Sequence, residues 1–342
     1  MGFTNIRKFP LPDEIIELVP LSKNLRELKA ERDREVRPVA EGASGKFLLV
    51  VGPCSAHEEE AVCDYVHRLA RVQERVAEKI VIVPRIYTNK PRTTGEGYKG
   101  MLHQPDPERA PDMVAGIVSI RRMHIRAIAE SGLSSADEML YPDNHVYVDD
   151  LLSYIAVGAR SVENQQHRLT ASGITVPVGF KNPTSGDLTV MLNAVFAAQC
   201  GHSFVYGGYE VETRGNPFAH AVMRGSVNQH GESLPNYHYE DLAVAAGMYA
   251  KRGLANPMII VDTNHANSKK VYTEQPRIAK EVLHSRKYSL DLRNLVRGLM
   301  IESYIEGGAQ TVDGHVYGKS ITDACLGWRE TEELIYYIAE NC

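Results

Sequence analysis

Short apolar runs, each followed by a residue able to bind an anion or a metal, recur along this 342-residue chain. Runs of this length that alternate with helical stretches are typical of buried parallel strands. We expect eight such strands, near residues 47–51, 80–87, 135–140, 155–160, 176–181, 203–207, 258–262 and 298–302. Because helical patterns separate these runs, the sequence predicts an α/β fold, the (β/α)8 barrel. With 43% hydrophobic residues, the chain can bury one large core of that kind.

Helical periodicity places the covering helices near residues 112–130, 145–153, 163–172, 187–199, 239–252, 275–286 and 329–340. Two regions depart from the alternation. Residues 1–45 are charged and are expected to form an N-terminal extension outside the core, with residues 46–342 forming a catalytic barrel. Residues 203–224 hold successive strand-like runs without a helix between them, which predicts a β-hairpin inserted near strand six. The sequence leaves open which of these runs closes the barrel.

Composition excludes several classes of protein. The net charge is -5 and the pI is near 6.2, so no general attraction to nucleic acid or to an anionic membrane is expected. No segment has the apolar length of a membrane span, and Phe9 and Pro10 stand where a signal peptide would continue its apolar core. Five irregularly spaced cysteines do not form a disulfide pattern, so a reducing, cytoplasmic location is expected.

Six cations lie at or just beyond the predicted strand ends. They are Arg85, Lys90, Arg92, Arg160, Lys181 and Arg224. In a parallel barrel the C-terminal ends of all strands open on one face, where the catalytic residues collect. Arginine and lysine are the side chains that bind phosphate and carboxylate groups, and six exceed the need of one phosphate. The sequence therefore predicts two anionic substrates, or one that carries both a carboxylate and a phosphate.

Four residues at the same strand ends have the chemistry of metal ligands. Cys54 follows the first strand, His265 the seventh and Glu302 the eighth, and Asp323 lies in the last loop. Sulfur, imidazole and carboxylate donors together suit one borderline divalent ion, Mn, Fe, Co or Zn, among which affinity alone does not choose. Their convergence on one face predicts a metal site beside the cations.

The order and spacing of these motifs resemble those of type I 3-deoxy-D-arabino-heptulosonate 7-phosphate (DAHP) synthases of the alpha subgroup. The resemblance extends over roughly residues 46–335. It is carried by residues 52–55 (GPCS), 90–94 (KPRTT), 158–160 (GAR), 177–182 (PVGFKN), 265–268 (HANS), 301–303 (IES) and 318–325 (GKSITDAC).

The resemblance implies an enzyme that condenses phosphoenolpyruvate with D-erythrose 4-phosphate to give DAHP and phosphate, the first step of the shikimate pathway. It implies that one divalent ion is held by Cys54, His265, Glu302 and Asp323. It implies that phosphoenolpyruvate is held by Arg85, Lys90, Ala159, Arg160, Lys181 and Arg224. Erythrose 4-phosphate would contact Arg92, Thr93 and Thr94, with Asp323 near its hydroxyl groups.

Three residues form the expected catalytic set. Lys90 can donate a proton to the alkoxide that forms when the two substrates join, and Glu138, at the end of the third strand, can orient or deprotonate the attacking water. His265 belongs to the set as a metal ligand. By resemblance, the N-terminal extension implies feedback control by an aromatic amino acid and assembly into a homodimer or a homotetramer.

Two alternatives compete with this prediction. A 3-deoxy-octulosonate 8-phosphate synthase uses arabinose 5-phosphate on a related barrel, but that family usually carries an Ala-Asn-Arg version of the loop that reads KPRTT at 90–94 here. A catalytically dead barrel that senses aromatic amino acids would be expected to lack a metal ligand, and none is lost. The chain does depart from the family pattern in a longer loop after Thr94, and at Asn264 and Tyr304.

Overall fold

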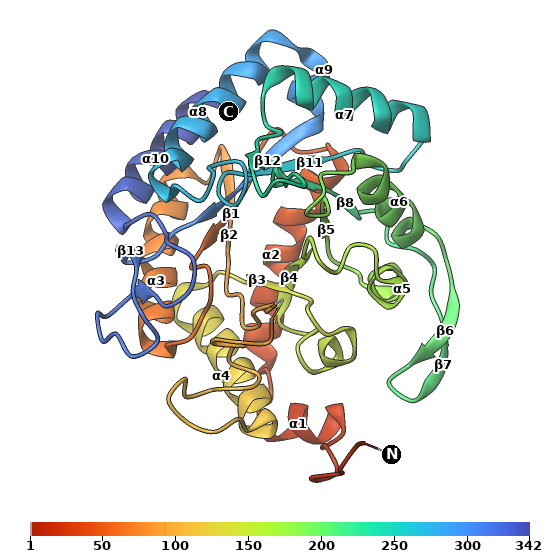
Figure 1. Cartoon of the computed structure of the whole chain (residues 1–342), viewed down its shortest axis with the longest axis vertical. Helices are drawn as coiled ribbons and strands as arrows, with labels where there is room; N and C mark the ends of the chain where they lie inside the picture. Colours follow the sequence, from red (N-terminus) through yellow and green to blue (C-terminus); the bar gives the residue numbers. More distant parts are fainter. Residues whose placement is uncertain (1, 93) are drawn as a thin grey trace.

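The computed structural model describes residues 2–92 and 94–342, so Thr93, expected at the sugar phosphate, lies outside the described residues. Eight parallel strands form a ring in Figure 1. In hydrogen-bonded order they are β2 (Ile80–Pro84), β1 (Phe47–Gly52), β12 (Val296–Glu302), β11 (Ile259–Asp262), β8 (His220–Met223), β5 (Val178–Lys181), β4 (Leu152–Val157) and β3 (Ser135–Glu138). Between β3 and β2 the ring closes through a single parallel bridge of Arg85 with Ala136. The predicted (β/α)8 barrel is confirmed.

Helices surround this ring on the outside (Figure 1). They are α3 (Glu59–Val76), α4 (Met113–Ser131), α5 (Gln165–Gly173), α6 (Leu188–Gln199), α7 (Tyr239–Arg252), α8 (Gln275–Tyr288), α9 (Leu290–Leu295) and α10 (Trp328–Asn341). The helix predicted at 145–153 is wrong. A 3-10 helix over Pro142–Tyr147 stands there instead, and β4 begins at Leu152, because the fully buried residues of 152–157 are needed in the barrel wall.

The sixth strand of the barrel is β8, not the predicted run at 203–207. That run forms β6 (Ser203–Tyr206), which pairs with β7 (Tyr209–Glu212) in an antiparallel hairpin outside the barrel. Val205 is 70% exposed, whereas all four residues of β8 are buried, and a strand of a parallel barrel is buried on both faces. The inserted hairpin itself is confirmed. Its turn, Gly207–Gly208, has positive φ at both residues, as a two-residue hairpin turn requires.

Two shorter strand pairs lie outside the barrel wall. An antiparallel pair joins β9 (Ser226–Val227) to β10 (Ser233–Leu234). A parallel pair joins β13 (Glu306–Ala309) to β14 (Lys319–Ser320), and the latter leads directly into the segment that carries Asp323. The second pair therefore fixes the loop from which the last expected metal ligand projects.

The N-terminal residues form α1 (Pro12–Leu18) and α2 (Lys23–Glu41), and the expectation that residues 1–45 lie outside the core is wrong for α2. Val36, Val39 and Ala40 are buried in one cluster with barrel-interior residues such as Leu48 and Met258.

Polar contacts show which end of the barrel α2 covers. Arg32 donates to the carbonyl of Gly132, and Arg37 to that of Thr175, just before β3 and β5 respectively. Arg297, near the start of β12, donates to the carbonyl of Ala40. Figure 1 shows α2 crossing the centre of the ring. The helix therefore closes the N-terminal end of the barrel, which we call the floor. The opposite end, where the strands terminate, is the mouth.

Among the described residues, no helix combines the length and the apolarity that a membrane span needs.

Candidate active site

The expected site residues meet at the mouth. Cys54 and Arg85 follow β1 and β2, Lys181 ends β5, Arg224 follows β8 and Glu302 ends β12. Each follows an apolar strand that forms because its residues are buried on both sides of the wall. The strand register therefore carries separate segments of the sequence to one end of the barrel.

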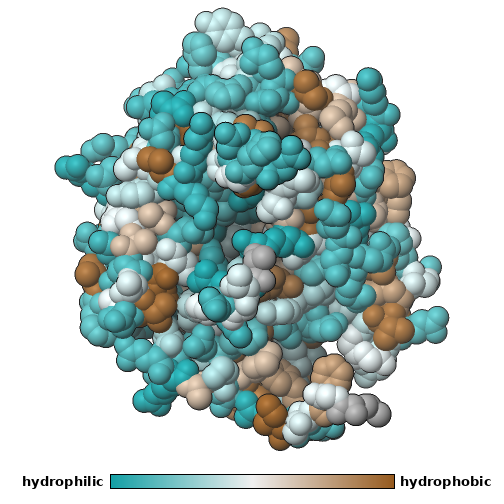
Figure 2. All heavy atoms as spheres, in the orientation of Figure 1, coloured by the Kyte–Doolittle hydropathy of each residue, from teal (hydrophilic) through white to brown (hydrophobic). Residues whose placement is uncertain are grey.

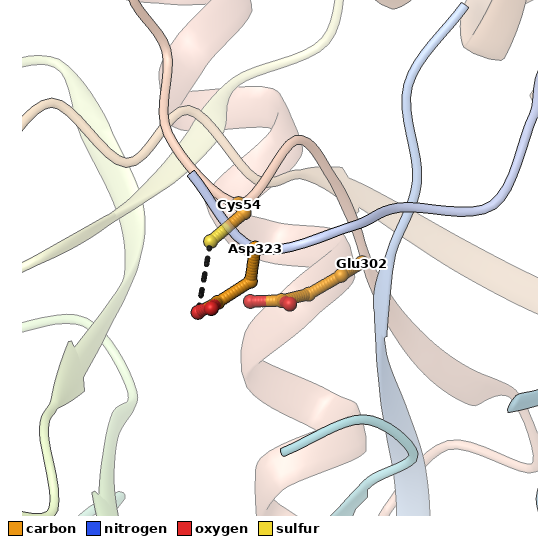
Figure 3. Close-up of side chains that lie close together, drawn as sticks. All are labelled: Cys54, Glu302 and Asp323. Atoms are coloured by element: carbon orange, nitrogen blue, oxygen red, sulfur yellow. Dashed lines mark hydrogen bonds between the residues drawn. The ribbon is translucent and has the colours of Figure 1, made fainter. Parts of the chain in front are cut away.

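Three of the four expected metal ligands form a compact group. The ligand atoms of Cys54, Glu302 and Asp323 all lie within 4.8 Å of one another. Figure 3 shows the three side chains converging, with the Cys54 Sγ donating to Asp323 Oδ2 over 3.5 Å. Cys54 and Glu302 are fully buried, and Asp323 is half-buried. Such a sulfur and carboxylate set can bind a divalent ion.

His265 lies beside this group rather than within it. Its Nε2 is 3.7 Å from Glu302 Oε1, and its Nδ1 is 2.9 Å from Asp262 Oδ2. Asp262 was not among the expected site residues, although it ends an apolar run as the cations do. A carboxylate on one ring nitrogen orients an imidazole so that the other nitrogen can bind a metal. Burial, opposed by Asp262, lowers the pKa of His265, which favours the neutral form needed by a ligand.

Buried cations balance the charge of the ligand group. Arg85 Nη2 is 2.6 Å from Glu302 Oε1, and Lys90 Nζ is 2.5 Å from Cys54 Sγ. Although burial opposes it, Arg85 lowers the pKa of Glu302. Burial also opposes the ionisation of Asp323, but Lys90, His265 and Lys270 together lower its pKa to about 2, so both carboxylates are ionised near neutral pH. Burial and Glu302 raise the pKa of Cys54 to about 11, so its thiol keeps its proton until a cation replaces it.

Guanidinium groups deeper in the mouth retain free donors. Among the described residues, Arg224 Nε and Nη1 and Arg85 Nη1 are buried without a hydrogen-bond partner. Lys181 is buried and pairs with Asp262 at 3.0 Å. A buried donor without a partner is costly, and arginine donors suit carboxylate and phosphate oxygens. These positions are therefore shaped for an anion.

The remaining expected residues line a loop at the edge of the mouth. Arg92 Nε donates to the carbonyl of Tyr98 over 2.8 Å, and the exposed Arg160 donates to that of Pro91 over 3.2 Å. Thr94 is exposed and Ala159 is half-buried. Arg92 and Arg160 therefore both contact the backbone of this loop.

Glu138 enters the mouth from β3. It is half-buried, and a Cβ built on Gly158 would lie 2.5 Å from its Oε1. The absence of a side chain at Gly158 therefore makes the space that the carboxylate occupies.

Figure 2 shows hydrophilic side chains over most of the face turned toward the viewer, including a hollow near its centre.

Comparison with known proteins agrees with this arrangement. Residues 24–335 match the DAHP synthetase I family. The chain belongs to this family. The resemblance predicted from the motifs is thereby confirmed, and family membership extends into α2, upstream of the barrel strands.

Individual members of the DAHP synthetase I family are similar over nearly their whole length. The Tyr-sensitive phospho-2-dehydro-3-deoxyheptonate aldolase of Escherichia coli K12 is 35% identical over 339 residues, covering 96% of this chain and 92% of that protein. The Trp-sensitive enzyme of Enterobacter agglomerans is 36% identical, covering 94% and 91%. A solved structure of phospho-2-dehydro-3-deoxyheptonate aldolase from Francisella tularensis SCHU S4 superposes with a TM-score of 0.90 at 29% identity, covering 99% and 98%.

Proposed function

We propose that this chain is the enzyme that condenses phosphoenolpyruvate with D-erythrose 4-phosphate to DAHP and phosphate, at the entry to the shikimate pathway. One observation carries the proposal. The chain belongs to the DAHP synthetase I family, and the mouth of its barrel brings together two kinds of group. One is the set of thiol and carboxylate side chains that can bind a metal ion, and the other is the buried guanidinium donors that have no hydrogen-bond partner among the described residues. The catalytic residues belong to the barrel of residues 46–342, and residues 1–45 supply the floor and contacts for assembly.

Two anion subsites account for the cations. Phosphoenolpyruvate carries a carboxylate and a phosphate, which need several cations close together. Five cations are assigned to it, together with the Ala159 backbone: Arg85, Lys90, Lys181 and Arg224 from the interior of the mouth, and the exposed Arg160 from its edge. The single phosphate of erythrose 4-phosphate is assigned to Arg92 and Thr94 on the edge loop, because a guanidinium group suits a bidentate phosphate contact.

The donor set fits one divalent ion, held by Cys54, Glu302 and Asp323 with His265 completing the set. When bound, the ion supplies a Lewis acid that polarises the erythrose aldehyde. Mn, Fe, Co and Zn all accept these donors. The replaceable proton on Cys54 and the nearby cations Lys90 and Arg85 keep the group balanced until the ion binds.

The side chains of the mouth then provide two proton transfers. C3 of phosphoenolpyruvate attacks the aldehyde carbon, and Lys90 Nζ donates a proton to the aldehyde oxygen. Burial opposes it, but Cys54 and Glu302 raise the pKa of Lys90 above its ordinary value, so the donor carries its proton. Glu138 accepts a proton from the water that adds to C2 of phosphoenolpyruvate. The C2–O bond to phosphate then breaks while the remaining C2 hydroxyl proton passes to the departing phosphate, leaving the ketone and inorganic phosphate.

The test is a phosphoenolpyruvate consumption assay with purified protein and each aldose phosphate. We expect turnover with erythrose 4-phosphate and at least tenfold lower kcat/KM with arabinose 5-phosphate. Preference for arabinose 5-phosphate would establish the octulosonate alternative. Binding of an aromatic amino acid without turnover of either aldose would establish the sensor alternative.

Control by an aromatic amino acid is part of the proposal. Relatives are named for sensitivity to Tyr, Trp or Phe. A cavity of about 680 Å³ lies beside the β6–β7 hairpin, and its lining combines the aromatic rings of Phe204 and Tyr206 with Arg37 and Asp149. A ring, a carboxylate and an ammonium group could each find a partner there. Addition of each aromatic amino acid to the assay tests this, and no inhibition by any of them would refute it.

Assembly into a homodimer or a homotetramer, and a cytoplasmic location, complete the proposal. Large apolar side chains are exposed on the N-terminal segment and on the hairpin, among them Phe3, Ile6, Val205 and Tyr209. Exposed apolar groups of this kind are typical of contact surfaces. All five cysteines are free thiols, as a reducing compartment permits. Light scattering of the purified protein measures the assembly.

A further inference from the structure

A buried carboxylate stands on the outer side of the barrel wall, next to a residue of the mouth. Residues of a strand alternate between its two faces. Ala136 belongs to the barrel-interior cluster, so Asp137 faces the surrounding helices, and Glu138 turns back toward the mouth. Asp137 is only 5% exposed. A carboxylate so buried is rare unless it is paired, and its partners therefore indicate its role.

The partners of Asp137 come from both sides of the seam between β2 and β3. Its Oδ1 accepts hydrogen bonds from the backbone N–H of Thr88 at 2.9 Å and from that of Glu138 at 2.7 Å. The Thr88 hydroxyl donates to its Oδ2. The carboxylate thus accepts three hydrogen bonds, all from residues next to the mouth.

His124, on α4, supports the carboxylate from behind. The ring is fully buried, and its Nδ1 lies 2.7 Å from Ser135 Oγ. Its Nε2 lies 3.6 Å from Asp137 Oδ2 and has no hydrogen-bond partner among the described residues. A histidine held by Ser135 with its free nitrogen toward Asp137 limits where the carboxylate can move.

These hydrogen bonds strengthen the contact between β2 and β3, the neighbouring strands with the least backbone pairing in the barrel. Between β2 and β3 the wall is closed by a single bridge, Arg85 with Ala136, whereas the other neighbouring strands share ladders. The Thr88–Asp137 bonds continue the joint beyond that bridge. Two residues after Thr88 comes Lys90, whose ammonium group lies 2.5 Å from Cys54 Sγ. One carboxylate therefore fixes both the segment that carries Lys90 and the backbone of Glu138.

We propose that Asp137, with the His124 ring beside it, is a positioning residue that sets Lys90 and Glu138 relative to each other for the two proton transfers. This inference rests on the proposed function. Asp137 faces the surrounding helices and not the interior of the barrel, so it acts through the two groups that it orients. Of the cations assigned to phosphoenolpyruvate, Lys181 and Arg224 lie on β5 and after β8, away from this seam, so binding should weaken less than kcat falls.

The test compares Asp137→Asn with Asp150→Asn in the full-length protein. Asp150 also pairs with a buried α4 residue, Arg121 at 2.6 Å, but it lies just before β4, toward the floor. We expect Asp137→Asn to lower kcat by roughly 10- to 100-fold, as small displacements of reacting groups do, with a smaller change in the KM for phosphoenolpyruvate. Asp150→Asn should lower the Tm and leave kcat unchanged.

A second pair of variants covers the case in which Asp137→Asn does not fold. Thr88→Val removes the hydroxyl that donates to Asp137, and Thr88→Ser retains it, so only Thr88→Val should lower kcat. Equal kcat in both variants would overturn the inference. So would a folded Asp137→Asn enzyme with kcat within twofold of wild type. If the wild-type protein itself fails to turn over the two substrates, the proposed function falls, and the inference falls with it.

Discussion

The two ends of the barrel are built from different chemistry. At the floor, Val36, Val39 and Ala40 of α2 lie in one buried cluster with strand residues such as Leu48 and Ile260. At the mouth, the same strands end in the buried pairs Arg85–Glu302 and Lys181–Asp262. The same barrel therefore has an apolar N-terminal end and a charged C-terminal end.

The difference indicates where stability and function reside. Apolar burial contributes directly to folding, at about 25 cal/mol per Å². Buried ion pairs must first overcome the cost of removing charges from water, and often contribute little net stability. The charged residues of the mouth therefore serve ligand binding more than stability, and the apolar residues of the floor and wall stabilise the fold. Substitutions at the mouth should therefore change activity, and substitutions at the floor should change stability.

The largest effect is expected from removal of a metal ligand at the mouth. Cys54→Ser should abolish at least 99% of activity, because a hydroxyl replaces thiolate poorly on a borderline ion and a buried ligand has no substitute. Circular dichroism and Tm should remain near wild type. Chelation of the wild-type enzyme should remove activity, and added Mn or Co should restore it. Full turnover after chelation would refute the metal assignment.

A charge placed in the floor should have the opposite effect. Val39→Asp buries an unpaired carboxylate among apolar side chains and should lower the free energy of unfolding by about 3–5 kcal/mol. The kcat of the folded fraction should remain near wild type. Ala30→Asp, on the exposed part of the same helix, is the matched control and should change stability by less than about 0.5 kcal/mol. Urea unfolding measures both, and equal losses would contradict the assignment of the floor.

Within the mouth, the two anion subsites should separate. Arg92→Ala should raise the KM for erythrose 4-phosphate, and Arg224→Ala should raise that for phosphoenolpyruvate. Loss of a charge-assisted contact costs about 1.5–3 kcal/mol, which is roughly 10- to 150-fold in affinity. Steady-state kinetics with each substrate varied in turn measures the shifts. If each variant affects both substrates alike, the two-subsite assignment is wrong.

The smallest effect on catalysis should follow removal of residues 2–8. These residues are exposed and precede Phe9, whose ring packs on Tyr147, so their loss leaves α1 and the floor intact. We expect kcat and KM within about twofold of wild type. Sensitivity to an aromatic amino acid should fall if this segment joins a neighbouring subunit at the effector site. A loss of Tm comparable to that of Val39→Asp would instead make the segment part of the floor.

Much of the site could be predicted from sequence because its signals are local. The runs that form β1, β2, β11 and β12 are apolar and short, and each is followed directly by a residue of the mouth. In a parallel barrel, position at a strand end is enough to bring such residues together. Cys54, Glu302 and Asp323 therefore converge although more than 200 residues separate the first from the others.

Other features were decided only by tertiary structure. Residues 203–206 and 220–223 are both strand-like, and only packing in the wall selects the second as the sixth barrel strand. The charged sequence of α2 conceals the three residues that seal the floor, since their burial depends on a surface built from distant strands. The pairing of Asp262 with Lys181, and of Asp137 with Thr88 and His124, joins side chains that no local pattern relates. Sequence determined which chemical groups stand at the strand ends, and the closed barrel decided which of them face one another, because burial and contact are properties of the whole fold.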